Sequence, residues 1–194
     1  FLYASSSSVY GMNSSQPFSE NASCDSPESY YASTKRANEL MAKSYFHTGG
    51  LSSIGLRFFT VYGPWGRPDM APILFANAAK KGSPIKVFNH GNQKRDFTFI
   101  ADIVEGIFSL TTLDEFPKDS LVVNIGNGAP VELMEFISLI EREMQVQLDK
   151  EYVNAQQGDV AVTFASTKRL EELTGYKPIV NLEDGIKSFI SWFK

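Results

Sequence analysis

Two side chains suited to proton transfer, Tyr31 and Lys35, stand four residues apart in this sequence. Residues at this spacing lie on one face of a helix, so a phenol and an ammonium there can serve one site. A phenol ordinarily loses its proton at a pH of about 10, so a tyrosine that acts as a base near neutral pH needs a positive charge beside it. Lys35 would supply that charge. An ordinary surface helix shows the same spacing and stays the alternative explanation.

A run of four serines, Ser5–Ser8, follows the largely apolar residues 1–4. Counted from Ser6, Tyr31 comes 25 residues later. A hydroxyl at the carboxyl end of a strand can hydrogen-bond a sugar hydroxyl or a developing ketone oxygen. The alternative is a polar turn whose hydroxyls satisfy backbone groups.

In order and spacing, these two elements resemble the extended short-chain dehydrogenase/reductase family, within its NAD-dependent nucleotide-sugar epimerases and dehydratases. The resemblance implies that Ser6, Tyr31 and Lys35 form the catalytic set. The tyrosine would take a proton from a sugar hydroxyl while a hydride leaves the same carbon for NAD. Lys35 would also hold the nicotinamide ribose beside Tyr31, so both residues are expected to contact the cofactor.

The segment Leu56–Pro64 resembles the family segment that lines the nicotinamide and then meets the substrate diphosphate. Phe58 and Phe59 are therefore expected at the cofactor. Thr60, where many sugar epimerases have Asn, is expected at the substrate.

Three later segments extend the resemblance to the nucleotide. Ile85–Phe88 resembles the strand that holds the uracil base, which implies substrate contacts from Lys86 and Phe88. An edge strand with one core-facing Phe explains that pattern equally well. Arg95 matches an arginine that contacts the diphosphate, where bidentate geometry favours Arg over Lys. Asp159 belongs to a segment that resembles the one closing over the nucleotide ribose and phosphates.

The two residues after Ser6 bear on the reaction. Dehydratases of the family carry an Asp-Glu pair there, because eliminating water needs an added acid and base. The family's decarboxylases carry a Glu at the second of those positions. This sequence has Ser7 and Ser8, which are expected to contact the substrate, so epimerisation through a 4-keto intermediate is favoured.

Arg67 bears on the identity of the sugar. The segment Gly63–Ala71 resembles its counterpart in UDP-glucuronate 4-epimerases, where the arginine pairs with the C6 carboxylate. The alternatives are a solvated arginine, or one paired with an acid while Asp69 caps the next helix. Two other functions also stay open: an epimerase or reductase of a neutral UDP- or dTDP-hexose, and an inactive fragment that binds only the nucleotide sugar.

Hydrophobic periodicity and turn residues predict alternating strands and helices. In the first helix, Ala32, Leu40, Met41 and Tyr45 are among the residues expected to be buried. The expected strands cover residues 1–5, 54–62, 85–88 and 121–125, and the expected helices cover 29–46, 70–81, 101–112 and 131–145. A last helix is expected to have Leu182, Ile186, Phe189, Ile190 and Phe193 on one face.

This alternation is typical of an α/β fold with a mostly parallel sheet. The resemblance makes it the C-terminal part of a Rossmann-like sheet plus a small α/β substrate-binding lobe. We expect the NAD-binding domain in residues 1–65 and 91–130, and the nucleotide-sugar lobe in 66–90 and 131–194.

The composition is that of a soluble globular protein, with 43% hydrophobic and 21% charged residues. A net charge of -4 gives no broad attraction to nucleic acid or to an acidic membrane. Cys24 is the only cysteine and there are two histidines, so neither an internal disulfide nor a metal site is expected. We expect a cytoplasmic enzyme, with a possible homodimer through the helix that carries Tyr31 and Lys35.

The family binds NAD through a glycine-rich turn that leads into a helix, and this sequence contains no such fingerprint. Phe1–Ala4 has the pattern of a buried strand entered partway. We therefore expect the C-terminal portion of an N-terminally truncated enzyme, and we expect this portion alone to bind NAD poorly.

Overall fold

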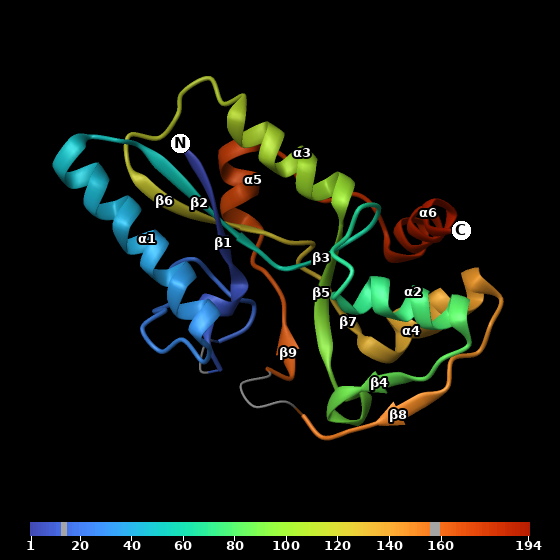
Figure 1. Cartoon of the computed structure of the whole chain (residues 1–194). Helices are drawn as coiled ribbons and strands as arrows, with labels where there is room; N and C mark the ends of the chain where they lie inside the picture. Colours follow the sequence, from blue (N-terminus) through green and yellow to red (C-terminus); the bar gives the residue numbers. More distant parts are fainter. Residues whose placement is uncertain (13–14, 156–159) are drawn as a thin grey trace.

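A parallel sheet forms one half of the fold, and its strands end together at one edge. The computed structural model describes residues 1–12, 15–155 and 160–194, arranged as in Figure 1. The register sets Ser6 opposite Phe58, and Phe58 opposite Ile125. In sheet order the strands are β1 (Leu2–Ser6), β2 (Ser53–Phe58) and β6 (Ser120–Ile125). Helices follow these parallel strands, so the predicted α/β fold is confirmed.

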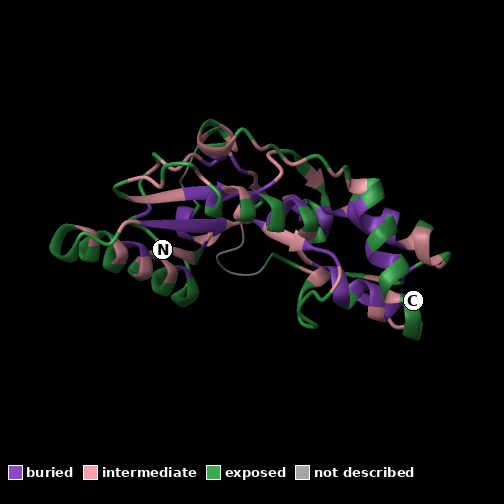
Figure 2. Ribbon diagram, turned by 90° about the horizontal axis from the view of Figure 1, so that it is seen from above, coloured by how far each residue is buried: buried purple, intermediate pink, exposed green. Residues whose placement is uncertain are grey.

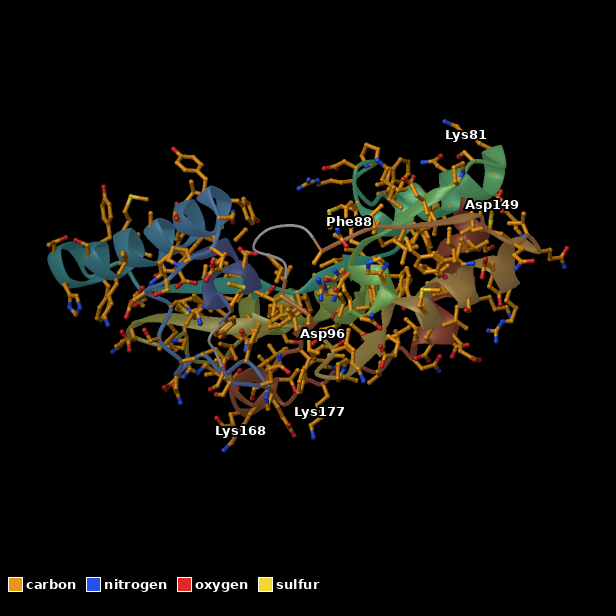
Figure 3. The ribbon with its side chains drawn as sticks, turned by 90° about the horizontal axis from the view of Figure 1, so that it is seen from below. Lys81, Phe88, Asp96, Asp149, Lys168 and Lys177 are labelled. Carbon is orange, nitrogen blue, oxygen red and sulfur yellow. The ribbon has the colours of Figure 1, made fainter. Side chains whose placement is uncertain are left out.

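Helices cover both faces of this sheet. Helix α1 contacts all its strands on one face, and α3 and α5 pack on the other through a buried cluster that includes Ile54, Ile103 and Leu170. In Figure 3, Lys168 at the start of α5 marks the face opposite α1. The bounds are α1 (Tyr30–Gly49), α3 (Ile100–Thr111) and α5 (Lys168–Thr174).

The other half packs helices around a second, four-stranded sheet, in which β5 pairs with each of the other three strands. Its apolar core includes the stacked rings of Phe97 and Phe136, with centroids 3.9 Å apart. Figure 2 shows buried stretches on the helices and strands of this half. The sheet strands are β3 (Thr60–Tyr62), β5 (Lys94–Phe99), β7 (Pro130–Glu132) and β9 (Val162–Thr163). The helices are α2 (Ala71–Lys81), α4 (Leu133–Met144) and α6 (Leu182–Phe193). A separate pair joins β4 (Ile85–Val87) to β8 (Lys150–Tyr152), and short 3-10 turns cover η1 (Ser7–Tyr10) and η2 (Phe88–Gly91).

The strand predicted over residues 54–62 is wrong in one respect, because Phe59 divides it. The chain leaves the parallel sheet after β2, and the Phe59 N–H still bonds the Ile125 carbonyl at 3.1 Å. From Thr60 the chain pairs with β5 in the other sheet. The sequence did not predict β5, β7, β8, β9 or α5, whose short or charged segments lack a clear apolar period.

The face of α1 that packs on the sheet also differs from the prediction. Ala32 is buried as expected, but the exposed fractions of Leu40, Met41 and Tyr45 are 54%, 55% and 65%. Glu39 is the buried residue of that stretch, because its carboxylate pairs with Arg57, which lies in the sheet. The orientation of the helix therefore follows its ion pair rather than its apolar residues.

Asp96 joins the two halves where β5 passes the turn after β6 (Figure 3). Its fully buried carboxylate accepts hydrogen bonds from the backbone N–H groups of Asn127, Gly128 and Ala165 at 2.7, 2.9 and 2.9 Å. Burial raises the pKa of Asp96, although these hydrogen bonds oppose the rise. The predicted division into two domains stays a prediction, and the burial of Leu170 against the parallel sheet favours placing α5 with that sheet.

Two absences concern only the described part of the chain. Every helix found there is too short or too polar to cross a lipid bilayer. Nowhere in the same residues do three His, Cys, Asp or Glu side chains gather as a metal site requires.

Candidate active site

Ser29 fixes where α1 begins and thus where Tyr31 lies. Its backbone is extended, with φ −140° and ψ 157°, and its Oγ accepts a hydrogen bond from the Ala32 N–H at 3.1 Å. This is the N-cap arrangement that satisfies a free N–H at a helix start. Tyr31 therefore lies in the first turn and Lys35 in the next, at the end of α1 that contacts η1.

The structure brings Tyr31 and Lys35 together at the sheet. The Lys35 Nζ lies 5.7 Å from the centre of the Tyr31 ring. The same ammonium donates a hydrogen bond to the Ala4 carbonyl of β1 at 3.1 Å. Among the described residues this carbonyl is its one hydrogen-bond acceptor, so two of the three N–H donors remain available. Tyr31 is 53% exposed, which leaves its phenol accessible.

Ser6 ends β1 and caps the 3-10 turn η1. Its Oγ accepts hydrogen bonds from the Ser8 backbone N–H at 3.2 Å and from the Ser8 Oγ at 2.9 Å. The polar-turn interpretation therefore describes part of what this hydroxyl does. Ser7 and Ser8 also line a cavity of about 200 Å³, together with Thr60 and Arg95.

A larger cavity of about 760 Å³ lies against α2, β4 and β5. It is lined by four predicted substrate residues: Thr60, Lys86, Phe88 and Arg95. Thr60 and Arg95 border the smaller cavity as well, so the two cavities share a wall. Sequence reasoning missed two polar residues of α2 that line it, Asn77 and Lys81. They are two of the three polar residues of a largely apolar helix, a signal that the sequence contained. Figure 3 labels Phe88 and Lys81 on this half of the molecule.

Backbone carbonyls hold the Arg95 guanidinium at the shared wall. Its Nη1 donates to the carbonyls of Val160 at 2.6 Å, Ala161 at 3.2 Å and Lys94 at 3.1 Å. The other predicted residue of this region, Asp159, lies outside the described residues.

Arg67 is already paired, with Asp69. The Arg67 Nε lies 3.0 Å from Asp69 Oδ1 and its Nη2 lies 2.5 Å from Oδ2, and both side chains are exposed. The hydrogen bonds that Arg67 donates to Asp69 raise the pKa of Arg67, and the Tyr31 phenol is near enough to add to the rise. Asp69 does not cap α2, because Met70 occupies that position without a side-chain bond, so this part of the alternative was wrong. Arg67 also borders a cavity of about 280 Å³ that includes Phe59.

The two phenylalanines predicted at the cofactor differ in burial. Phe58 is half-buried and packs at the edge of the sheet's apolar cluster. Phe59 is 7% exposed, with its ring centroid 6.4 Å from that of Tyr10 and 6.3 Å from that of Phe18. Most of the Phe59 side chain thus belongs to the core. Contact of either residue with a cofactor stays a prediction.

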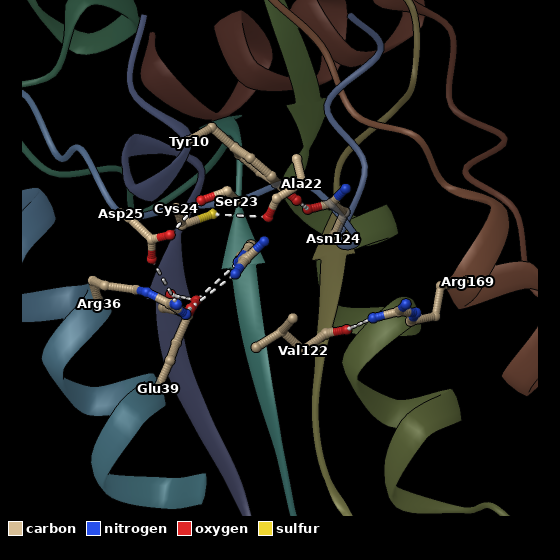
Figure 4. A network of polar contacts seen from close by, with 12 residues as sticks. Tyr10, Ala22, Ser23, Cys24, Asp25, Arg36, Glu39, Val122, Asn124 and Arg169 are labelled. Atoms are coloured by element: carbon tan, nitrogen blue, oxygen red, sulfur yellow. Dashed lines mark hydrogen bonds and ion pairs between the residues drawn. The ribbon is translucent and has the colours of Figure 1, made fainter. Parts of the chain in front are cut away.

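A buried ion pair that the sequence analysis missed lies beneath Lys35. Glu39 and Arg57 are 4% and 2% exposed, and Figure 4 shows Glu39 and Arg36 reaching from α1 toward the sheet. Burial acts to raise the pKa of Glu39, but the hydrogen bonds and charge of Arg57 hold it below its ordinary value. Arg57 also lies over the Tyr10 ring at 4.7 Å, and burial raises the Tyr10 pKa to about 12. The sequence contained one signal of this pair. Arg57 follows three largely apolar strand residues, and a charged side chain buried in a strand needs a partner of opposite charge.

The chain matches a described protein family, the NAD dependent epimerase/dehydratase family, over residues 1–126. It belongs to this family. The matched region contains Ser6, Tyr31, Lys35 and Arg67, and the predicted family membership is confirmed. The family assignment by itself names neither the sugar nor the direction of the reaction.

Several individual proteins are similar to this chain over nearly its whole length. An uncharacterised protein of Methanocaldococcus jannaschii is 51% identical over 99% of this chain and 58% of its own length. A probable UDP-glucuronate 4-epimerase of Rhizobium meliloti is 43% identical over 99% of this chain and 61% of its own length. The crystal structure of Bacillus cereus UDP-glucuronic acid 4-epimerase with UDP-glucuronic acid and NAD gives a TM-score of 0.92 at 31% identity, covering 99% of this chain and 60% of that one. The chain thus spans about three fifths of the length of these relatives.

Proposed function

We propose that this chain supplies the catalytic and substrate-binding residues of an NAD-dependent 4-epimerase that acts on UDP-glucuronate through a 4-keto intermediate. The observation that carries the proposal is the position of Lys35 beside the Tyr31 ring, with its ammonium bonded to the Ala4 carbonyl two residues before Ser6. The similarity to a Bacillus cereus enzyme in complex with UDP-glucuronic acid and NAD supports the choice of cofactor and sugar.

The proton would pass between the sugar C4 hydroxyl and the Tyr31 oxygen. The Lys35 ammonium stabilises negative charge on that oxygen, which a phenol needs if it is to act as a base near neutral pH. The Ser6 hydroxyl, whose oxygen accepts two hydrogen bonds from Ser8, has its own proton available for the developing ketone oxygen. The same groups serve the return step, in which the ketone oxygen takes its proton back.

The residues around Lys35 fit the nicotinamide end of NAD. Two N–H donors of its ammonium face no acceptor in the described part of the chain, and ribose hydroxyls are suitable acceptors. Tyr31 is accessible beside them, and the half-buried Phe58 lies at the same strand edge as Ser6. When bound, NAD supplies a reversible hydride acceptor, the part of the chemistry that protein side chains lack.

The two adjoining cavities suit an elongated nucleotide sugar. The larger, at about 760 Å³, has a volume typical of ligand sites and contains an aromatic ring, Phe88, against which a base can pack. Lys86 and Arg95 supply positive charge for a diphosphate. The smaller cavity leads from Arg95 to Ser7 and Ser8, so the sugar would lie beside the serine turn.

The test uses the full-length gene product with UDP-glucuronate and NAD, with UDP-galacturonate measured by chromatography. We expect epimerisation by the wild type and a loss of at least about 100-fold in kcat for Tyr31→Phe, because the proton-transfer group is removed. Tyr30→Phe is the matched control, since Tyr30 is the neighbouring tyrosine and 88% exposed. Full activity of Tyr31→Phe, or no turnover by the wild type, would refute the proposal.

The Arg67–Asp69 pair favours a second candidate, a 4-epimerase of a neutral UDP-hexose, because a substrate carboxylate would have to displace Asp69. Arg67→Ala separates the two functions. A large loss of kcat/KM for UDP-glucuronate with little change for UDP-galactose supports the uronic acid. Equal effects on the two substrates support the neutral sugar.

We also propose that α1 takes part in a homodimer. The side chains of Leu40, Met41 and Tyr45 form an exposed apolar strip on this helix, which supports burial against another surface. A cytoplasmic location stays a prediction from composition.

A further inference from the structure

The Glu39 carboxylate joins three elements of the fold at one point. It accepts hydrogen bonds from the Ser5 Oγ of β1 at 2.6 Å and from the Arg57 Nε and Nη2 of β2, both at 2.8 Å. Arg36, one turn earlier on α1, donates at 3.0 Å and also reaches Asp25 (Figure 4). Four donors therefore fix both carboxylate oxygens, and the group has little freedom to rotate.

Each partner of Glu39 adjoins a residue of the proposed active site. Glu39 follows Lys35 by four residues, on the same face of α1. Ser5 directly precedes Ser6, and Arg57 directly precedes Phe58. A shift at Glu39 would thus move the helix that carries the lysine relative to both strand ends.

Two side-chain hydrogen bonds join α1 to β1 in the described part of the chain, one from Lys35 and one to Glu39. Among the described residues, the side-chain hydrogen bonds between the two elements are Lys35 to Ala4 and Ser5 to Glu39. The Lys35 bond is formed by a long side chain that is partly exposed, so it sets the helix position weakly. The buried Glu39 bond, backed by the forked contact with Arg57, sets it strongly.

Stabilisation of the fold does not by itself explain why an ion pair, Glu39–Arg57, occupies this buried position. Removing two charges from water offsets much of their attraction, so apolar residues of similar volume often hold an interface as well as a buried ion pair does. A forked ion pair differs from apolar packing in fixing direction and register. Proton transfer depends on register, because a misplacement of about 1 Å can cost about 100-fold in rate.

We propose that Glu39 and Arg57 are positioning residues, which set α1 against β1 and β2 so that Lys35 and Tyr31 face Ser6. This inference rests on the proposed function. It adds that the ion pair acts on the rate and on NAD binding through Lys35, while the nucleotide cavity is unaffected because Lys86 and Phe88 lie on other elements.

The experiment compares Glu39→Leu/Arg57→Met, which replaces the pair by apolar groups, with wild type in the full-length gene product. We expect a melting temperature close to wild type, a fall in kcat of at least about 10-fold, and a KM for the nucleotide sugar within about threefold. Asp25→Asn is the matched control, because it removes the outer partner of Arg36 and leaves Glu39–Arg57 in place. A kcat within twofold of wild type in the double variant would overturn the inference.

Arg57→Lys covers the case in which the double variant does not fold. It keeps the buried charge but loses the fork, so we expect the same fall in kcat in a folded protein. Calorimetry on both variants also separates this inference from the proposed function. Weaker NAD binding with unchanged UDP binding supports positioning through Lys35 even if the wild type turns over no UDP-sugar. Unchanged NAD binding would reject the inference even if the wild type is an epimerase.

Discussion

Gly185 of α6 offers the sharpest test of the packing between α6 and β3. A Cβ at this position would lie 2.0 Å from the Tyr62 Oη and 2.9 Å from its Cζ, where real contacts stay beyond 3.0 Å. The phenol therefore has to move by about 1 Å (3.0 minus 2.0) before an alanine fits. Tyr62 cannot do so freely, because its ring lies edge-on to buried Phe136 at 5.4 Å.

Two opposing effects set the size of the change in Gly185→Ala. Overpacking a rigid core costs about 1–3 kcal/mol, and alanine in place of glycine within a helix returns about 1 kcal/mol. The difference between these effects is about 0–2 kcal/mol, and because the ring has to move by about 1 Å we expect the upper half of it, a net loss of roughly 1–2 kcal/mol. Such a loss lowers the melting temperature by about 2–8 °C for a protein of this size. Thermal and urea unfolding, followed by tryptophan fluorescence, would measure it.

The second half of the test removes the atom that clashes. In the Tyr62→Phe background, which lacks the Oη, Gly185→Ala should cost less than it does in wild type. The double variant should therefore lose less stability than the sum of the losses in the two single variants. If Gly185→Ala is as stable as wild type, or if the Tyr62→Phe background changes nothing, the close approach of α6 to β3 is not as described.

Three further predictions concern α1. Ser29→Ala removes the N-cap and should cost about 1 kcal/mol of stability with a lower kcat, measured by thermal melting and steady-state kinetics, whereas Ser33→Ala should do neither. Because the pKa of Glu39 in the folded protein lies below its ordinary value, its ion pair stabilises the fold above a pH of about 4.3 and loses this effect as the pH falls. The melting-temperature deficit of Glu39→Gln should therefore be larger at neutral pH than at a pH of about 3.5, and a constant deficit would contradict this reasoning. Met41→Lys should shift a homodimer to monomer in analytical ultracentrifugation, while Lys43→Ala should leave the assembly unchanged.

The sequence predicted the parts of the site that depend on local spacing. Tyr31 and Lys35 lie one helical turn apart, so any helix through them brings their side chains to one face. Ser6 follows an apolar strand, and the carboxyl end of such a strand is where open α/β folds place ligands. In each case, the residues that determine the position of the side chain lie within a few residues of it in the sequence.

Features set by distant partners could not be predicted in the same way. The buried face of α1 depends on Arg57, which lies 18 residues from Glu39 and in another element, so apolar periodicity chose the wrong face with Leu40 and Met41. Strand β5 begins with charged residues, and one of them, Asp96, is buried only because backbone N–H groups at 127, 128 and 165 converge on it. These partners lie more than 30 residues from Asp96, so the residues around Asp96 do not predict them.

The crossing at Phe59 limits the distance between the proposed cofactor site and the proposed substrate site. Phe58, expected at the cofactor, and Thr60, which lines the substrate cavities, are separated by this single residue. Two peptide units span at most about 7 Å, and bond geometry rather than packing sets that limit. In the proposed complex, this limit keeps the backbone at the cofactor close to the backbone at the sugar, even if the two halves flex against each other.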